Sequence, residues 1–140
     1  MTAQKIILDT GPLVAFLNKK DRHHEWAKAQ FATMSPPLLT CEAVLSEACY
    51  LVRNFKNGVV NALKLLERDL ISIPFRLQDE LSAIKLLLDK YQDLPMSLAD
   101  GCLVRMSEQI SDSVIFTLDL DFEIYRKDKR KVIPVIMPSW

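Results

Sequence analysis

The sequence is poor in the residues that define several classes of protein. It has three glycines among 140 residues and no G-x-x-x-x-G-K-[ST] segment that would cradle nucleotide phosphates. Its three cysteines, Cys41, Cys49 and Cys102, show no C-x-x-C spacing, which favours reduced thiols over a zinc site or a disulfide framework. Its two histidines, His23 and His24, are adjacent on an expected helix surface. A zinc protein and a phosphate-loop nucleotidase are therefore disfavoured.

Neither sign of charge predominates, and long apolar runs are missing. Eighteen Lys and Arg cancel eighteen Asp and Glu, which argues against a coat protein that binds nucleic acid by charge alone. A nuclease remains compatible, because metal-binding carboxylates would offset a basic surface that grips phosphates. The N-terminal apolar run is broken at Asp9, too early for a signal peptide or a spanning helix. We therefore expect a cytoplasmic protein without a membrane partner.

Length and composition predict one folded domain. Hydrophobic residues make up 49% of the chain and charged residues 26%, as in ordinary globular proteins. No repeat, low-complexity segment or linker divides the sequence, and Pro36-Pro37 marks a loop. We expect a single domain over residues 1–140.

Short apolar runs alternate with stretches of helical periodicity along the chain. Strands are expected where β-branched and apolar residues cluster, and helices where apolar residues recur every three or four positions. The expected strands are 5–8, 38–41, 70–74, 114–117 and 132–135, and the expected helices are 12–18, 22–33, 42–54, 59–68, 77–91 and 97–109. This alternation predicts an α/β fold, a three-layer sandwich with a central parallel sheet of about five strands flanked by helices.

Acidic residues follow two of the expected strands. Asp9 ends the strand 5–8, and Asp119 and Asp121 lie in the loop after the strand 114–117. Open parallel sheets bind ligands beyond the carboxyl ends of their strands, so Asp9 and Asp119 would face each other if the strand order reverses between them. Taken singly, each of these aspartates is equally consistent with a turn or a helix cap.

Glu47 is expected in the middle of the helix 42–54. Its neighbours three and four positions away include Val44 and Leu51, which predicts a carboxylate on the packed side of the helix. A carboxylate buried there must be paired, protonated or bound to a cation, because burying a bare charge is costly. An ion pair with Arg53 or Arg105 is the structural alternative.

Asp100 is expected in the first turn of the helix 97–109. Ser97 stands three positions before it, which is the S-x-x-[DE] spacing of a capping box. That spacing alone favours a structural role. A carboxylate in the first helical turn can also project toward a neighbouring strand end, so the two roles are compatible.

Carboxylates that converge without basic partners repel one another, and hard cations relieve the repulsion. Mg²⁺ and Mn²⁺ prefer oxygen ligands and bind through a few carboxylates together with the phosphates of a substrate. Two such ions can activate a water and stabilise the departing oxygen during phosphodiester cleavage. The residues themselves therefore favour a metal-dependent nuclease.

Five segments of the chain form a recognisable set. In chain order they are Ile7–Ala15, Asp21–Glu25, the helix with Glu47, Ser97–Gly101 and Thr117–Phe122. This set resembles the PIN-domain ribonucleases, especially the VapC-like toxins of bacterial toxin–antitoxin pairs, and its last member is similar to the family's closing T-x-D-x-D-F motif. The five segments span almost the whole chain in the right order. Gly101 stands where such proteins more often have alanine, a small-for-small change that leaves the acids intact.

The resemblance implies a five-stranded parallel sheet and an Mg²⁺- or Mn²⁺-dependent endoribonuclease that hydrolyses RNA. It implies that the catalytic, metal-binding acids are Asp9, Glu47, Asp100 and Asp119, with Asp121 assisting the metal. By the same resemblance, the hydroxyls of Thr10 and Thr117 would orient carboxylates or water.

Basic runs and apolar stripes suggest partners. Arg126–Lys131 is the densest basic run and could attract an RNA backbone, as could Lys19–Arg22, although solvated connectors fit both equally well. Most of the apolar stripe at Leu63–Leu66 and in the following helices must be core. Some of it could form a homodimer or, by the resemblance, a groove for a cognate antitoxin.

Other functions compete with an RNA-cleaving toxin. A PIN-type nuclease could serve RNA processing without an antitoxin, and a non-catalytic binding module could keep the fold and use its acids for structure. The module would be favoured by a lost acid, and none is lost. Receiver domains and aspartate phosphatases also cluster carboxylates on parallel sheets, but Gly11 stands where such a phosphatase needs its second aspartate.

Overall fold

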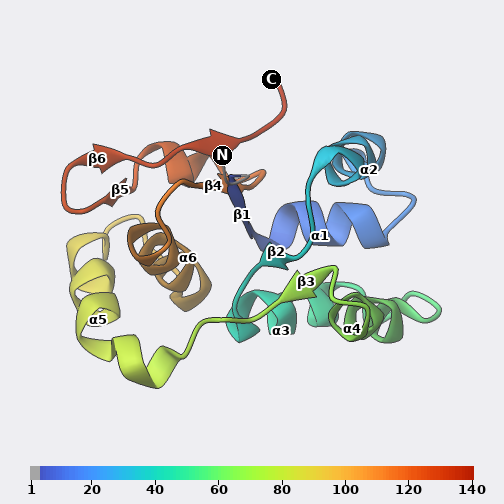
Figure 1. Cartoon of the computed structure of the whole chain (residues 1–140), viewed down its shortest axis with the longest axis horizontal. Helices are drawn as coiled ribbons and strands as arrows, with labels where there is room; N and C mark the ends of the chain where they lie inside the picture. The colour runs from blue at the N-terminus through green and yellow to red at the C-terminus, as the bar shows by residue number, and fades with distance from the viewer. Residues whose placement is uncertain (1–3) are drawn as a thin grey trace.

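The structure is a computed structural model that describes residues 4–140, and a five-stranded parallel sheet forms its centre (Figure 1). The sheet strands are β1 (Lys5–Leu8), β2 (Leu38–Leu39), β3 (Ile71–Ser72), β4 (Ser113–Phe116) and β7 (Val135–Ile136). Their order across the sheet is β3-β2-β1-β4-β7. The chain therefore winds outward from β1 to β3 and then crosses to β4 on the other side of β1. The strand order reverses between β1 and β4, which is the condition under which Asp9 and Asp119 were expected to face each other.

Helices flank the sheet, with α1 and α2 on one side of the strands and α5 and α6 on the other (Figure 1). The helices are α1 (Thr10–Leu17), α2 (His24–Thr33), α3 (Glu42–Leu51), α4 (Gly58–Glu67), α5 (Leu81–Lys90) and α6 (Leu98–Gln109). Two short 3₁₀ turns, η1 (Leu77–Glu80) and η2 (Leu120–Glu123), precede α5 and follow β4. The α/β sandwich predicted from the sequence is confirmed.

The two central strands are apolar because both of their faces are covered. All four residues of β4 are buried, as are Ile6, Ile7 and Leu8 of β1. The two strands pair in register from Lys5 with Ser113 to Leu8 with Phe116. Strands covered on both faces lose the polar alternation of half-exposed strands. The register brings both carboxyl ends to the same edge of the sheet.

The prediction for the C-terminal strand is wrong. The strand expected at 132–135 is in fact two separate pieces, because Val132 belongs to β6 (Lys131–Val132) and the sheet continues with β7. β6 pairs antiparallel with β5 (Arg126–Lys127), so the basic run, for which RNA attraction and a solvated connector were both considered, forms a hairpin. At α1, Asp9 is the N-cap, and its side chain accepts from the Thr10 N–H.

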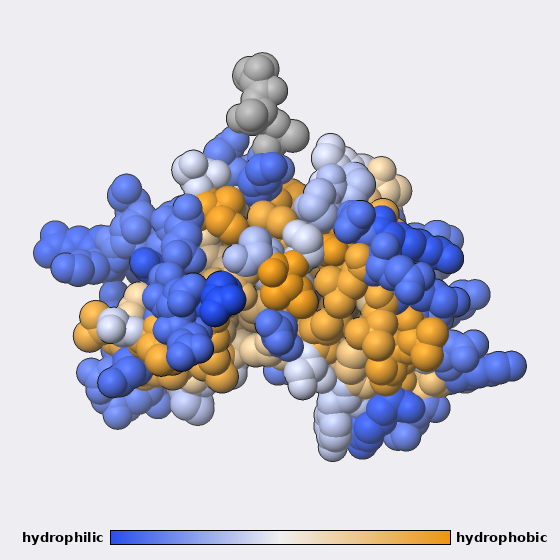
Figure 2. Space-filling view, turned by 60° about the horizontal axis from the view of Figure 1, so that its bottom comes forward, coloured by the Kyte–Doolittle hydropathy of each residue, from blue (hydrophilic) through white to orange (hydrophobic). Residues whose placement is uncertain are grey.

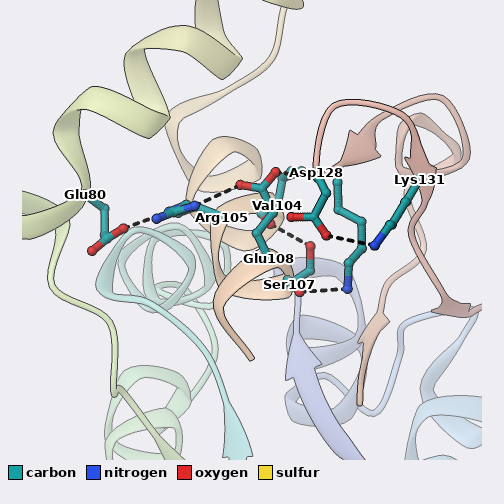
Figure 3. Close-up of polar contacts among 8 residues, drawn as sticks. Glu80, Val104, Arg105, Ser107, Glu108, Asp128 and Lys131 are labelled. Carbon is teal, nitrogen blue, oxygen red and sulfur yellow. Dashed lines mark hydrogen bonds and ion pairs between the residues drawn. The ribbon is translucent and has the colours of Figure 1, made fainter. Parts of the chain in front are cut away.

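The β5–β6 hairpin is held against α6 by polar contacts. The Lys127 ammonium donates to the carbonyl of Ser107 at 2.8 Å, and the Asp128 N–H donates to Glu108 Oε2 at 2.7 Å. Figure 3 shows how Glu108 also pairs with Arg105, whose guanidinium reaches Glu80 at 2.7 Å. The hairpin is therefore fixed to the last turns of the helix whose first turn carries Asp100.

Apolar side chains also reach the surface. Figure 2 shows apolar surface on the side of the molecule that carries α3 and α4. Exposed apolar residues of these helices are Leu51, Val59, Val60 and Leu63. Within residues 4–140, no helix combines the length and the apolar character needed to cross a membrane.

Candidate active site at the carboxyl edge of the sheet

A cavity of about 740 Å³ opens where β1 and β4 end, and we call it the acidic cavity. Its lining includes all five acids predicted from the sequence, namely Asp9, Glu47, Asp100, Asp119 and Asp121. The strand ends supply Asp9 and the loop with Asp119, while α3 supplies Glu47 and α6 supplies Asp100. Segments far apart in sequence thus bring their carboxylates to one place.

Asp9 is the most buried of the five acids, with 6% of its surface exposed. Its Oδ1 accepts from the Thr10 N–H at 2.7 Å, and its Oδ2 accepts from the Thr117 hydroxyl at 2.7 Å. Burial raises the pKa of Asp9 to about 7; these hydrogen bonds oppose the rise, and the negative charges of Asp100 and Asp119 add to it. The carboxylate is therefore held in place by neutral donors, and none of the ion pairs among residues 4–140 involves it.

Asp119 caps the turn after β4 and also lines the acidic cavity. Its side chain caps η2 by accepting from the Asp121 N–H at 2.9 Å. Its own N–H donates to the Thr117 hydroxyl at 2.9 Å. Thr117, which is fully buried, therefore joins Asp9 to the loop that carries Asp119 and Asp121.

Asp100 is held at the start of α6. The Ser97 hydroxyl accepts from the Asp100 N–H at 3.0 Å, so the serine half of the predicted capping box is present. Among the described residues, the Asp100 carboxylate does not accept the reciprocal hydrogen bond from the Ser97 N–H. The carboxylate turns toward Tyr125, whose hydroxyl donates to Asp100 Oδ2 at 2.9 Å. Burial raises the pKa of Asp100, and the charges of Asp119 and Glu47 raise it further. Ser97 therefore caps the helix, while the Asp100 carboxylate in its first turn faces the other carboxylates of the cavity.

Glu47 lines the acidic cavity, but its side chain is not buried as predicted. The side chain is exposed, whereas the sequence predicted a buried carboxylate. The buried face of α3 is made by Val44 and Ala48, and Glu47 lies beside that face. The ion-pair alternatives are also wrong, because Arg105 pairs with Glu80 and Glu108 instead, and the Arg53 guanidinium stacks on the ring of Tyr50 at 3.7 Å.

Thr10 lines the acidic cavity, but its hydroxyl does not contact Asp9. The contact is made by the Thr10 backbone N–H, and the buried hydroxyl has no hydrogen-bond partner within the described residues. Beside it, Gly11 lies so close to the loop after β4 that an added Cβ would be 3.1 Å from Leu118 Cβ. Glycine therefore allows α1 to approach the loop that carries Asp119.

Sequence reasoning gave no role at this site to Asp21, His23 and Tyr125, and it named Arg22 only as part of a basic run that could attract RNA. The lining also contains Asp21, Arg22 and His23, and Tyr125 contacts Asp100 directly. The first three lie in the segment Asp21–Glu25, whose resemblance to the PIN family was the available signal. No pattern in the sequence pointed to Tyr125, because its hydrogen bond to Asp100 depends on how the chain turns after η2. Arg22 is the one Lys or Arg that lines the cavity as the structure describes it.

The donor set fits a hard divalent cation. All five acids offer oxygen, the ligand that Mg²⁺ and Mn²⁺ prefer, and the ion pairs formed among residues 4–140 involve none of them. The partnerless Thr10 hydroxyl adds a further oxygen beside Asp9. As the side chains lie, no three His, Cys, Asp or Glu of the described residues converge closely enough to hold a metal. Rotation of the exposed Glu47 is one adjustment that ion binding would require.

Comparisons with known proteins agree with this architecture. The PIN domain family model matches residues 6–128. Among solved structures, the chain is similar to Mycobacterium tuberculosis VapC20, described as a sarcin–ricin loop cleaving toxin. The two share 21% sequence identity over 93% of this chain and 100% of that one, with a TM-score of 0.78. A search of curated proteins found no match.

Proposed function

Because the chain belongs to the PIN-domain family, we propose that it is an endoribonuclease that hydrolyses RNA phosphodiester bonds with Mg²⁺ or Mn²⁺ held in the acidic cavity. The observation that carries the proposal is the gathering of five carboxylates at one sheet edge with no ion-pair partner among the described residues. Such a cluster is electrostatically costly unless a cation binds there.

Asp9, Glu47, Asp100 and Asp119 would hold the ion, and Asp121 would assist. A bound divalent cation would supply a water of lowered pKa and charge compensation for the phosphate. The chain's own residues prepare the site. Thr117 and the Thr10 N–H fix both oxygens of Asp9, which leaves its carboxylate little freedom to rotate.

Arg22 is suited to hold the substrate. It is exposed on the cavity lining, and it takes part in none of the ion pairs formed among residues 4–140. Its guanidinium can donate two parallel hydrogen bonds to a phosphate. We assign it to the phosphate backbone of the RNA.

The biological setting we propose is that of a toxin, by likeness in fold to VapC20. A cognate antitoxin and a homodimer would cover apolar surface such as that of α3 and α4. We place the protein in the cytoplasm and treat residues 1–140 as one domain. A PIN-type RNA-processing nuclease without an antitoxin would use the same site.

The test is cleavage of single-stranded and structured RNA by the purified chain in Mg²⁺, Mn²⁺ or EDTA. Asp119→Asn and Asp100→Asn are compared with Asp93→Asn, the same change at an exposed residue that does not line the cavity. Cleavage that needs the metal, is lost in the first two variants and persists in the third supports the nuclease. A wild type that neither cuts RNA nor binds Mn²⁺ by calorimetry would favour the non-catalytic binding module.

A further inference from the structure

Tyr125 lies between the acidic cavity and the β5–β6 hairpin. Its side chain is fully buried, and its hydroxyl donates to Asp100 Oδ2 at 2.9 Å. Its backbone N–H donates to the carbonyl of Asp121 at 3.0 Å. One residue therefore touches two of the acid-bearing segments, the start of α6 and the turn η2.

The ring of Tyr125 is held by two other aromatic rings. Tyr91, at the end of α5, meets it edge to face with 5.1 Å between ring centroids, and Phe122 of η2 does so at 5.2 Å. The Tyr91 hydroxyl in turn accepts from the Arg126 N–H at 2.8 Å. These contacts restrain the ring of Tyr125, whose hydroxyl donates to Asp100.

The hairpin that follows Tyr125 is fixed to the same helix that carries Asp100. Figure 3 shows its contacts with the last turns of α6, where Asp128 reaches Glu108. The Lys90 ammonium of α5 adds a hydrogen bond to the carbonyl of Lys129 at 2.8 Å. Tyr125 therefore starts a segment that is anchored on α6 at both ends, which restrains the phenol relative to Asp100.

We propose that Tyr125 is a positioning residue of the proposed nuclease, orienting the Asp100 carboxylate for the divalent cation through the hydrogen bond to Oδ2. This inference rests on the proposed function. A phenol suits the task because it is a neutral donor that fixes one oxygen and leaves the negative charge available to the cation. A lysine or arginine in its place would neutralise the carboxylate and compete with the metal.

Tyr125→Phe tests the inference, with Tyr91→Phe as the matched control. Both changes remove one buried phenol oxygen from the same pair of packed rings, but only Tyr125 donates to an acid of the cavity. The measurements are the melting temperature in EDTA, the Mn²⁺ dissociation constant by calorimetry, and kcat and KM for RNA cleavage. Any structural effect of losing a hydroxyl appears in EDTA for both variants.

We expect Tyr125→Phe to weaken Mn²⁺ binding by about tenfold or more and to lower kcat, with KM for RNA little changed. Tyr91→Phe should leave both quantities within about twofold of the wild type. If the wild type binds Mn²⁺ and cuts RNA while the two variants behave alike, the inference is overturned and the proposed function stands. If the wild type neither binds Mn²⁺ nor cuts RNA, both are overturned.

Discussion

The Thr117 hydroxyl donates to Asp9 Oδ2 at 2.7 Å although 108 positions separate the two residues in sequence. This hydrogen bond joins the end of β1 to the end of β4, the neighbouring strands between which the strand order reverses. The same hydroxyl accepts from the Asp119 N–H. One threonine therefore sets the position of two acids of the proposed metal site.

Asp9→Asn should change how stability depends on pH in metal-free protein. The pKa of Asp9 rises from 3.8 to about 7 on folding, mainly through burial, so the folded state binds this proton more tightly than the unfolded state. The Asp9 contribution to stability is then fully present below pH 3.8, falls as the pH rises toward 7, and stays reduced above it by roughly 4 kcal/mol at most. Asparagine removes this titration, so in EDTA the variant should be the more stable protein at pH 8.

The measurement is urea unfolding of both proteins in EDTA between about pH 4 and 8, followed by melting curves with and without Mn²⁺. Near pH 4 the variant should be slightly less stable, because an amide oxygen and nitrogen cannot accept both hydrogen bonds that Asp9 accepts. Mn²⁺ should raise the melting temperature of the wild type alone. A difference in unfolding free energy that stays constant over this pH range would contradict the burial argument.

Thr10→Val should separate a site role from a structural one. The Thr10 hydroxyl is buried without a hydrogen-bond partner in the described part of the chain, so its loss should leave the unfolding free energy in EDTA unchanged or slightly higher. If this hydroxyl orients a water or an ion in the loaded site, Mn²⁺ affinity should fall by about tenfold.

The control for Thr10→Val is Thr40→Val, which removes a fully buried hydroxyl that donates to the carbonyl of Leu8 at 2.8 Å. That change should cost about 1 kcal/mol of unfolding free energy and leave Mn²⁺ affinity near the wild-type value. Equal Mn²⁺ affinities in Thr10→Val and the wild type would remove Thr10 from the site.

The strand ends and their acids could be predicted from the sequence, because an apolar run followed by an acidic residue is a local pattern that does not depend on the rest of the fold. Asp9 and Asp119 each follow a strand whose residues are buried on both faces, and the reversal of strand order then places them together. Glu47 shows the limit of the same reasoning. Helical spacing gives its position relative to Val44, but whether that face meets core or cavity depends on how α3 sits against α1 and α6.

The β5–β6 hairpin could not be predicted from its own residues. Its strands are two residues each and include Arg126, Lys127 and Lys131, which have neither apolar alternation nor high strand propensity. Polar contacts with α6, such as the one from Lys127 to the Ser107 carbonyl, hold it in place. Tertiary contacts of this kind leave no local pattern, and the role of Tyr125 was hidden for the same reason.

Gly101→Ala should stabilise the protein and leave the active site unchanged. An added Cβ would lie 3.4 to 3.7 Å from side-chain atoms of Leu88, Met96 and Ile84, which is close to ordinary van der Waals contact. Alanine within a helix is favoured over glycine by about 1 kcal/mol. We expect an unfolding free energy higher by about that amount, measured in urea, with RNA cleavage unchanged.

Gly11→Ala is the contrasting variant. Its Cβ would lie 3.1 Å from Leu118 Cβ, so the residue before Asp119 must move. We expect a loss of cleavage larger than the loss of stability explains. Cleavage lost in Gly101→Ala, or kept in full in Gly11→Ala, would contradict this account of how closely α1 and the loop after β4 pack.

Arg22→Ala should weaken RNA binding without changing metal binding. Arg22 is the Lys or Arg of the described chain that lines the acidic cavity, and a phosphate is the anion that would enter beside the carboxylates. We expect KM for RNA to rise by about tenfold with Mn²⁺ affinity unchanged. Arg22→Lys should recover part of the loss, because a lysine keeps the charge but cannot donate two parallel hydrogen bonds to one phosphate.

The matched control is Arg68→Ala, an exposed arginine outside the cavity. Losing one phosphate contact should also reduce the slope of log affinity against log salt by about 0.7 for single-stranded RNA, a change that the control should not show. If Arg22→Ala and Arg68→Ala weaken RNA binding equally, the effect is one of overall charge, and the substrate's phosphate must be held by another part of the surface.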